Sequence, residues 1–128
     1  MIHKVNVSLA GIETIELELD DKIAPRTVNS FLDCLPLNIE IHVWGEELYT
    51  DRISIEVGKE NSKSLVDKMD VAYWPDGSAI CLFFGPTPIG GKDQIKPYSP
   101  VNVIGKIRSD IVSVKNIREG TRALFRVG

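Results

Sequence analysis

The stretch YWPDGSAICLFFGPTPIGG, residues 73 to 91, contains a turn, an apolar strand and the start of an irregular loop. Pro75, Asp76 and Gly77 are typical turn residues. The segment 78–85 that follows them is almost wholly apolar, which is expected of a strand that is buried on both faces. Two prolines and three glycines then end the strand. The stretch therefore predicts a central strand with an aromatic-rich turn on one side and a loop on the other.

Alternation of apolar and polar residues predicts further strands on both sides of this stretch. In residues 2–20 the alternation runs on either side of Gly11, which predicts an antiparallel hairpin that turns at this glycine. About eight such strands in so short a chain predict a mainly β structure that closes into a barrel or packs as a sandwich, and the pattern leaves both open. The other predicted strands cover 39–49, 51–57, 69–74, 101–107 and 121–127.

Two or three short helices are predicted between the strands. Apolar residues at helical spacing indicate a helix between residues 20 and 36, with Pro25 in its first turn and Pro36 as its stop. A second short helix is predicted over 61–69, capped by Asn61 or Ser62, and a third over 109–117, opened by Ser109 or Asp110. Residues 86–100 hold four prolines and two glycines, which favours a functional or mobile loop.

Composition narrows the class of protein. A chain of 128 residues with 43% hydrophobic and 26% charged residues is typical of one globular domain, here residues 1–128. The net charge of −3 argues against binding of nucleic acid through its phosphates. Because no apolar run is long enough to span a membrane and no secretory signal precedes the first strand, we expect a cytoplasmic protein with no membrane partner.

Metal and cofactor chemistry have little support in the sequence. Cys34 and Cys81 belong to no C-x-x-C pair and are predicted to be two buried thiols. His3 and His42 lie on separate predicted strands without a partner at metal-ligand spacing. The glycines of GPTPIGG lack the strand-to-helix setting that phosphate binding needs. We therefore expect neither a metal nor a cofactor.

Three stretches, in this order, resemble cyclophilins. IETIELELDDKIAPRTVNSFLDCL is similar to the first strand and helix of that family, CLFFGPTPIGGK to its Q-F-F strand and the loop after it, and VNVIGKIRSDIVSVKNI to its V-F-G-x-V strand and short helix. The chain also resembles a family of small prokaryotic cyclophilin-like proteins at WGEELY (44–49), YWPDGSAICLFFGPTP (73–88) and VNVIGKI (101–107). The resemblance implies a closed eight-stranded antiparallel β-barrel with two or three short helices that cap its ends.

The resemblance also implies which positions would catalyse prolyl isomerisation. Cyclophilins stabilise the twisted prolyl amide with an arginine in an F-H-R segment, whose arginine position is Val43 here. The glutamine of Q-F-F corresponds to Leu82, the M-A-N segment to residues 73–75, and the pocket histidine falls near Val101. The barrier is about 20 kcal/mol, and a preorganised donor contributes about 3–4 kcal/mol. Valine cannot donate, so we expect no efficient isomerase activity.

The leading hypothesis is an aromatic groove that binds a small ligand or a short peptide, including a proline-containing one. The resemblance places Phe84 on the groove face and Phe83 in the barrel core. Glu47, or its neighbour Glu46, is the candidate for binding a basic or hydroxyl-bearing ligand. The expected groove residues are Trp44, Glu47, Tyr49, Tyr73, Trp74, Leu82 and Phe84.

Two alternatives stay open at this point. The first is a peptidyl-prolyl isomerase that uses Arg52 or Tyr73 in place of the missing arginine. The second is an enzyme that acts through Glu46 or Glu47. These adjacent carboxylates point to opposite faces of a strand, so they form no acid and base pair unless Gly45 introduces a bulge. Tyr73 and Trp74 are more often packing residues than ligand contacts.

Overall fold

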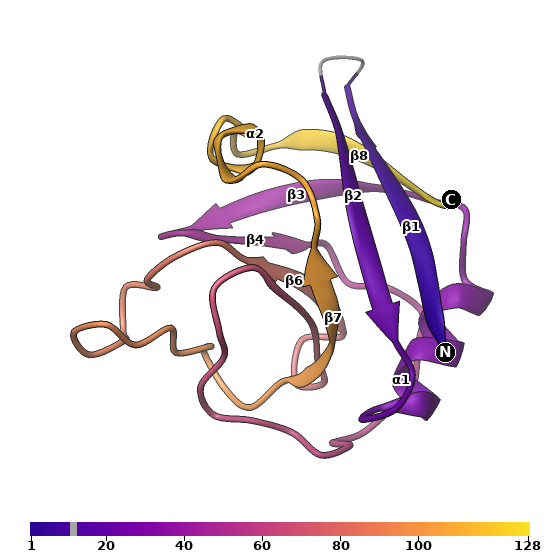
Figure 1. Cartoon of the computed structure of the whole chain (residues 1–128), viewed down its shortest axis with the longest axis horizontal. Helices are drawn as coiled ribbons and strands as arrows, with labels where there is room; N and C mark the ends of the chain where they lie inside the picture. The colour runs from indigo at the N-terminus through magenta and orange to yellow at the C-terminus, as the bar shows by residue number, and fades with distance from the viewer. Residues whose placement is uncertain (11–12) are drawn as a thin grey trace.

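The eight strands close into one antiparallel barrel in the order β1-β2-β7-β5-β6-β4-β3-β8 (Figure 1). The structure is a computed structural model that describes residues 1–10 and 13–128, so the predicted turn at Gly11 lies outside the described residues. The closed eight-stranded barrel implied by the resemblance is confirmed. Its strands are β1 (Ile2–Leu9), β2 (Glu13–Asp20), β3 (Leu37–Trp44), β4 (Glu47–Thr50), β5 (Asp70–Trp74), β6 (Ala79–Phe83), β7 (Asn102–Ile107) and β8 (Thr121–Val127).

The main core fills the inside of the barrel. Alternate residues of each strand point inward, and their removal from water is the dominant favourable contribution to folding. The helix α1 (Pro25–Asp33) packs at one end, where Phe31 meets Phe125 edge to face at 5.9 Å. The helix α2 (Ile111–Lys115) lies at the opposite end (Figure 1). Central members of this core are Val5, Val7, Ile15, Leu17, Leu19, Ile41, Leu48, Val71, Ile80, Leu82 and Ile104.

Each helix is capped by a carboxylate. Pro25 stands in the first turn of α1 as predicted, and the carboxylate of Glu60 accepts hydrogen bonds from the backbone N–H groups of Arg26 (3.1 Å) and Thr27 (2.9 Å). A distant residue therefore satisfies N–H groups that the helix itself leaves unpaired. In α2 the cap is Asp110, which accepts from the N–H of Val112 at 2.9 Å. Asp110 is one of the two residues, Ser109 and Asp110, that were predicted to begin this helix.

The predicted strand 39–49 is divided by a turn at residues 45–46 into β3 and β4, and two other predicted elements are wrong. Residues 51–57 alternate as expected, with Ile53 and Ile55 buried, but they form no ladder and pack against the main core as an extended segment. Residues 61–69 form no helix. Asn61 has a φ of +48°, and isolated bridges join this segment to the residues before β7. In both cases contacts with distant segments override a local pattern.

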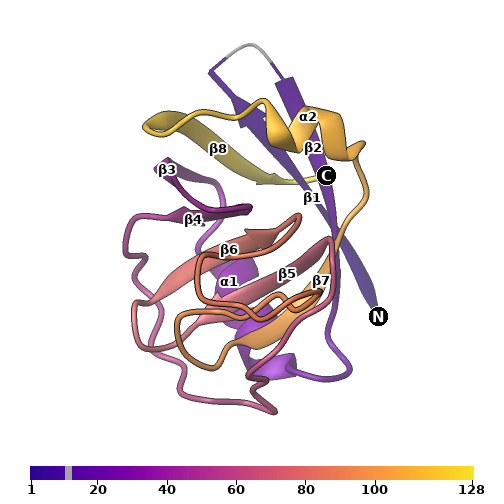
Figure 2. The ribbon, with the colours of Figure 1, turned by 90° about the vertical axis from the view of Figure 1, so that its left-hand side faces the viewer.

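The strand β6 is buried on both faces, as its sequence predicts. Leu82 belongs to the main core, whereas Cys81 and Phe83 belong to a second apolar cluster outside the barrel wall. The irregular segment between β6 and β7 passes across this outer face (Figure 2). The second cluster consists of Val66, Ala72, Cys81, Phe83 and Val101, with Tyr49, Trp74, Ile95 and Val103 at its edge.

The remaining expectations concern the cysteines and membrane spans. Cys81 is buried as predicted, but Cys34 is only half-buried. In the part of the chain that the structure describes, neither helix has the length or apolar character needed to cross a membrane.

Candidate functional site

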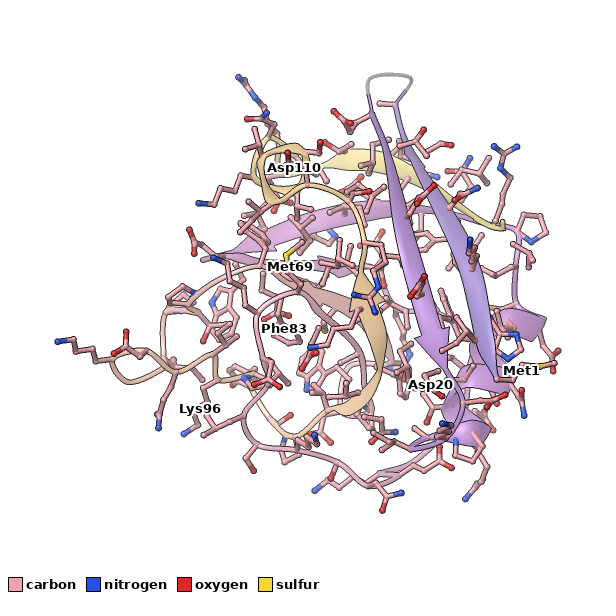
Figure 3. The ribbon with its side chains drawn as sticks, viewed as in Figure 1. Met1, Asp20, Met69, Phe83, Lys96 and Asp110 are labelled. Atoms are coloured by element: carbon pink, nitrogen blue, oxygen red, sulfur yellow. The ribbon has the colours of Figure 1, made fainter. Side chains whose placement is uncertain are left out.

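A pocket of about 170 Å³ lies on the outer wall of the barrel, at the edge of the second apolar cluster. Its wall comes from β3, β4, β5 and β6, and its outer side comes from the loop before β7, in which Lys96 is labelled in Figure 3. The pocket is smaller than the roughly 300 Å³ of a typical site for a drug-sized ligand. It therefore fits a small molecule or a single side chain. Its lining residues are Trp44, Glu47, Tyr49, Trp74, Cys81, Pro97, Tyr98 and Val101.

Strand register brings the wall residues to one face. Trp44 pairs with Glu47 across β3 and β4, and Tyr49 pairs with Cys81 across β4 and β6. Residues directly opposite each other in an antiparallel pair have their side chains on the same face. A two-residue turn joins β3 to β4, and its Gly45 has a φ of +59°. A Cβ at Gly45 would also lie 2.7 Å from Pro88 Cδ, so glycine is required on two grounds.

Three aromatic rings form the mouth of the pocket. The ring of Tyr98 stands edge-on to Trp44 at 6.1 Å and to Trp74 at 5.9 Å between centroids. Trp74 Nε1 donates a hydrogen bond to Ser99 Oγ at 2.6 Å, and that hydroxyl donates to Asp76 at 2.6 Å. These two linked hydrogen bonds orient the indole and leave its N–H already paired. Tyr98 is 71% exposed, so the mouth opens to solvent beside it.

Glu47 is the buried polar group of the pocket. Its side chain is only 5% exposed, and its Oε1 has no hydrogen-bond partner among the described residues. Burial raises the pKa of Glu47 to about 7, and the nearby Cys81 thiol opposes that rise. Burial and the nearby carboxylate raise the pKa of Cys81 in turn. A buried carboxyl group with an unused acceptor, at the base of a pocket, indicates a functional site.

A charged cluster lies beside the pocket. The ring of His42 packs against Tyr49 with centroids 5.2 Å apart, and its Nδ1 hydrogen-bonds to Glu119 at 2.6 Å. Its Nε2 hydrogen-bonds to Asp51, and these bonds raise the pKa of His42. Glu40, His42 and Asp51 bring ligand atoms within 4.8 Å of one another. The expectation that His42 lacks such neighbours is wrong, but both ring nitrogens already have carboxylate partners.

The structure brings four of the seven predicted groove residues together. Trp44, Glu47, Tyr49 and Trp74 line the pocket. Three others were expected there and lie instead in the main core: Tyr73, Leu82 and Phe84. The expected placement of Phe83 and Phe84 was thus on the wrong faces of the strand, because a period of two separates two faces without saying which one is outside.

Neither Arg52 nor Tyr73, the two candidates to replace the missing arginine, lines the pocket. Tyr73 is 1% exposed, and its hydroxyl donates to the backbone oxygen of Ile55 at 3.2 Å. Arg52 is exposed and lines a different surface depression, together with residues 53–56. Val43, the expected arginine position, packs against the barrel core rather than lining the pocket. The prediction that Arg52 or Tyr73 reaches the groove is therefore wrong.

Glu46 and Glu47 lie in different surroundings, because Glu46 belongs to the turn and Glu47 begins β4. Glu46 is half-buried, its N–H donates to the Pro86 oxygen at 3.0 Å, and its carboxylate lies over Gly85, where an added Cβ would be 1.6 Å from Oε2. Glu47, the first residue of β4, enters the pocket. The two carboxylates thus have different surroundings without a bulge.

Sequence reasoning missed four lining residues. Tyr98 lies between Pro97 and Pro100 in the loop that was expected to be functional. An aromatic residue in that loop was the feature of the sequence that could have indicated its place in the site. Cys81 is on the same strand face as Phe83, so the correct choice of face would have found it. The missed residues are Cys81, Pro97, Tyr98 and Val101.

The closed antiparallel barrel, with its covering loop, defines a cyclophilin-like protein. A family model described as Cyclophilin-like matches residues 3–126, and this chain belongs to that family. Among solved structures, it is similar to a hypothetical protein from Archaeoglobus fulgidus with 37% identity and a TM-score of 0.81, over 99% of this chain and 95% of that one. No protein with a curated description matches the chain.

Proposed function

We propose that the pocket binds a small ligand, or one side chain of a short peptide, with Glu47 as its polar anchor. The observation that carries this proposal is the buried Oε1 of Glu47 without a partner in the described structure. An unsatisfied buried polar group costs about 1–3 kcal/mol, and more if it is charged. A ligand that hydrogen-bonds to the Glu47 carboxyl group, with Oε1 turned toward the pocket, offsets that cost, and the surrounding rings supply apolar contact. Fold membership alone carries no function.

The same pocket is poorly suited to prolyl isomerisation. No arginine, lysine or histidine is among its described lining residues, and the indole N–H of Trp74 is engaged by Ser99. Stabilising a twisted prolyl amide requires a preorganised donor or positive charge at the reacting group. A carboxylate provides neither when ionised. The proposed activity is therefore binding without efficient isomerisation, and the proposed partner is a small molecule or peptide rather than nucleic acid or a membrane.

A second candidate function is general acid or base catalysis by Glu47. Its pKa of about 7 is the specific observation in favour, because a catalytic group works best when its pKa is near the operating pH. The two functions differ in their outcome. A bound compound that is released unchanged supports binding, whereas conversion of the compound that is lost in Glu47→Gln supports catalysis.

The test of the binding proposal is a fragment screen by two-dimensional NMR, with resonances assigned. Its panel contains neutral, cationic and anionic fragments and short proline peptides. We expect binding fragments to shift the indole signals of Trp44 and Trp74 and the ring signals of Tyr98. Tyr98→Ala, at an exposed position, should weaken these hits, and Val112→Ala on α2 is the matched control because it is 59% exposed and outside the pocket. Hits that map elsewhere, or none at millimolar concentration, contradict the proposal.

A further inference from the structure

We propose that the ligand of this pocket is a protonated alkylamine with at least one N–H, which donates to the carboxylate of Glu47 while its methylene groups lie against the rings of Trp44, Trp74 and Tyr98. This inference rests on the proposed function, because it assigns a chemical class to the occupant of the same pocket. Three features support it: the charge of the lining, the chemistry of the walls and the hydrogen-bonding capacity of Glu47.

The charge of the pocket favours a cation. Glu47 is the one carboxylate among the described lining residues, and no basic side chain lines the pocket to balance it. Nearby carboxylates add to the negative potential: burial is the main cause of the raised pKa of Tyr49 at the wall, and the charges of Glu119 and Asp51 raise it further. His42 hydrogen-bonds to both of these carboxylates, so they offset the positive charge of its protonated ring. The other titratable side chains in the described lining of the pocket are Tyr49 on β4, Cys81 on β6 and Tyr98 in the loop before β7, and Glu46 is adjacent to Glu47 in the chain.

The walls favour an organic cation over a neutral polar ligand. Trp74 has its only polar atom bonded to Ser99, so it presents ring carbon to the pocket. Tyr98 meets Trp44 and Trp74 at interplanar angles of 66° and 76°, so its ring is steeply inclined to both and does not stack parallel to either. Aromatic faces attract cations within about 6 Å of the ring centroid, and tryptophan does so best. A neutral ligand gains no such electrostatic attraction from the ring faces.

The hydrogen-bonding capacity of Glu47 decides which ammonium fits. At pH 8, above its pKa of about 7, Glu47 is mostly ionised and its carboxylate only accepts hydrogen bonds. Its Oε1 has no partner among the described residues, and a ligand that donates an N–H satisfies it once the carboxylate turns this oxygen toward the pocket. A quaternary ammonium has no N–H, so it would leave Oε1 unsatisfied despite its favourable charge. The volume of about 170 Å³ and the exposed Tyr98 at the mouth allow a small charged head inside and an alkyl tail toward solvent. Primary to tertiary alkylammonium ions meet these conditions.

The experiment compares four probes of similar size by NMR titration of the full chain at pH 8. The probes are butylammonium, butan-1-ol, butyrate and trimethylbutylammonium. We expect butylammonium to bind in the pocket at least tenfold more tightly than butan-1-ol or butyrate. The quaternary probe should bind more weakly than butylammonium. In Glu47→Gln the preference for butylammonium over butan-1-ol should fall by about tenfold, whereas Glu46→Gln, outside the pocket, should keep it.

The possible failures are distinguishable. Equal binding of butan-1-ol and butylammonium in the pocket overturns the inference while the binding function stands. Equal binding of the quaternary probe overturns the requirement for an N–H. If no probe binds, the inference fails, and the fragment screen then decides the binding function separately. Because Glu47→Gln keeps the size of the side chain, its fold can be checked by the unchanged signals of the main core.

Discussion

Tyr49 and Cys81 lie directly opposite each other across β4 and β6, with both side chains on the outer face of the barrel wall. Two residues before Tyr49, Glu47 occupies the same face and pairs with Phe83. This register puts a carboxyl group, a thiol and aromatic rings under one covering loop. The pocket is therefore a product of strand pairing, and its chemistry depends on how the buried carboxyl group is satisfied.

Glu47→Gln should stabilise the ligand-free protein at alkaline pH. The folded pKa of Glu47 is raised from 4.5 to about 7, so its contribution to stability is fully present below pH 4.5 and is lost as pH rises through 7. That shift corresponds to about 3 kcal/mol. The glutamine does not titrate. Between pH 4.5 and above 7, the free energy of unfolding of the variant should therefore rise relative to that of the wild type by about that amount.

Urea unfolding of both proteins at several pH values measures this difference. Glu46→Gln is the control for loss of a neighbouring charge, because its side chain lies over Gly85 and outside the pocket. A difference in free energy of unfolding between Glu47→Gln and wild type that stays constant from pH 4.5 to above 7 would show that Glu47 is not desolvated.

The protein should not accelerate prolyl isomerisation. The uncatalysed exchange takes tens to hundreds of seconds, and the pocket offers no described cationic donor to the amide. Exchange spectroscopy on a short proline peptide should give the same rate with and without the protein, and an active cyclophilin serves as positive control. Clear acceleration that disappears in Tyr98→Phe would mean that the pocket isomerises peptides through this hydroxyl.

Ser99→Ala should free the indole of Trp74. The substitution removes the acceptor of Trp74 Nε1 and breaks the link to Asp76. We expect the indole N–H signal to move upfield and to exchange faster with water, with a loss of stability of about 1 kcal/mol or less. Ser54→Ala is the matched control, because Ser54 is exposed and outside the pocket. An unchanged indole signal would contradict the hydrogen bond.

Tyr73→Phe should affect stability and leave binding unchanged. It removes the hydrogen bond from the buried hydroxyl to the Ile55 oxygen, which costs about 1 kcal/mol. Thermal unfolding measures the cost, and the butylammonium titration measures affinity. A loss of affinity as large as that in Tyr98→Ala would place Tyr73 in the pocket after all.

His42 should titrate above its usual pKa of 6.5 because Asp51 and Glu119 hydrogen-bond to its ring. The stability that it contributes is fully present below pH 6.5 and is lost as pH rises through the folded value. The two carboxylates are 52% and 60% exposed, so screening by solvent limits the effect to about 1 kcal/mol or less. NMR titration of the His42 ring tests this prediction, and Glu119→Gln should lower the midpoint. A wild-type midpoint at or below 6.5 would contradict the cluster.

The barrel was predictable because its strands carry their own pattern. Apolar, buried residues occupy every second position from Val5 to Leu9 in β1 and from Ile15 to Leu19 in β2, and this period of two differs clearly from the helical period of α1. The segment 51–57 alternates in the same way but has no strand beside it to pair with, and periodicity cannot report that absence. The predicted helix over 61–69 is absent because this segment instead forms isolated bridges to Val101 and Ile95, with bends and a turn between and after them.

The site was predictable only in part. WGEELY contains three residues that line the pocket, because strand register brings Trp44, Glu47 and Tyr49 to one face. In β6 the apolar residues cover both faces, so composition could not tell the pocket side from the core side. Tyr98 reaches the pocket from a loop whose path depends on tertiary contacts. One of these is the hydrogen bond from Thr87 Oγ1 to the Lys96 oxygen at 2.5 Å.

The most direct test of the account is the pKa of Glu47, measured by carbon NMR of its side-chain carboxyl group with and without saturating butylammonium. In the free protein the account predicts a midpoint of about 7, because the carboxyl group is buried and Oε1 has no described partner. With the amine bound, the midpoint should fall below that of the free protein, since the cation stabilises the ionised form. A free midpoint at or below the ordinary 4.5 would show a solvated or already paired carboxylate, and the pocket would then have no anchor to offer.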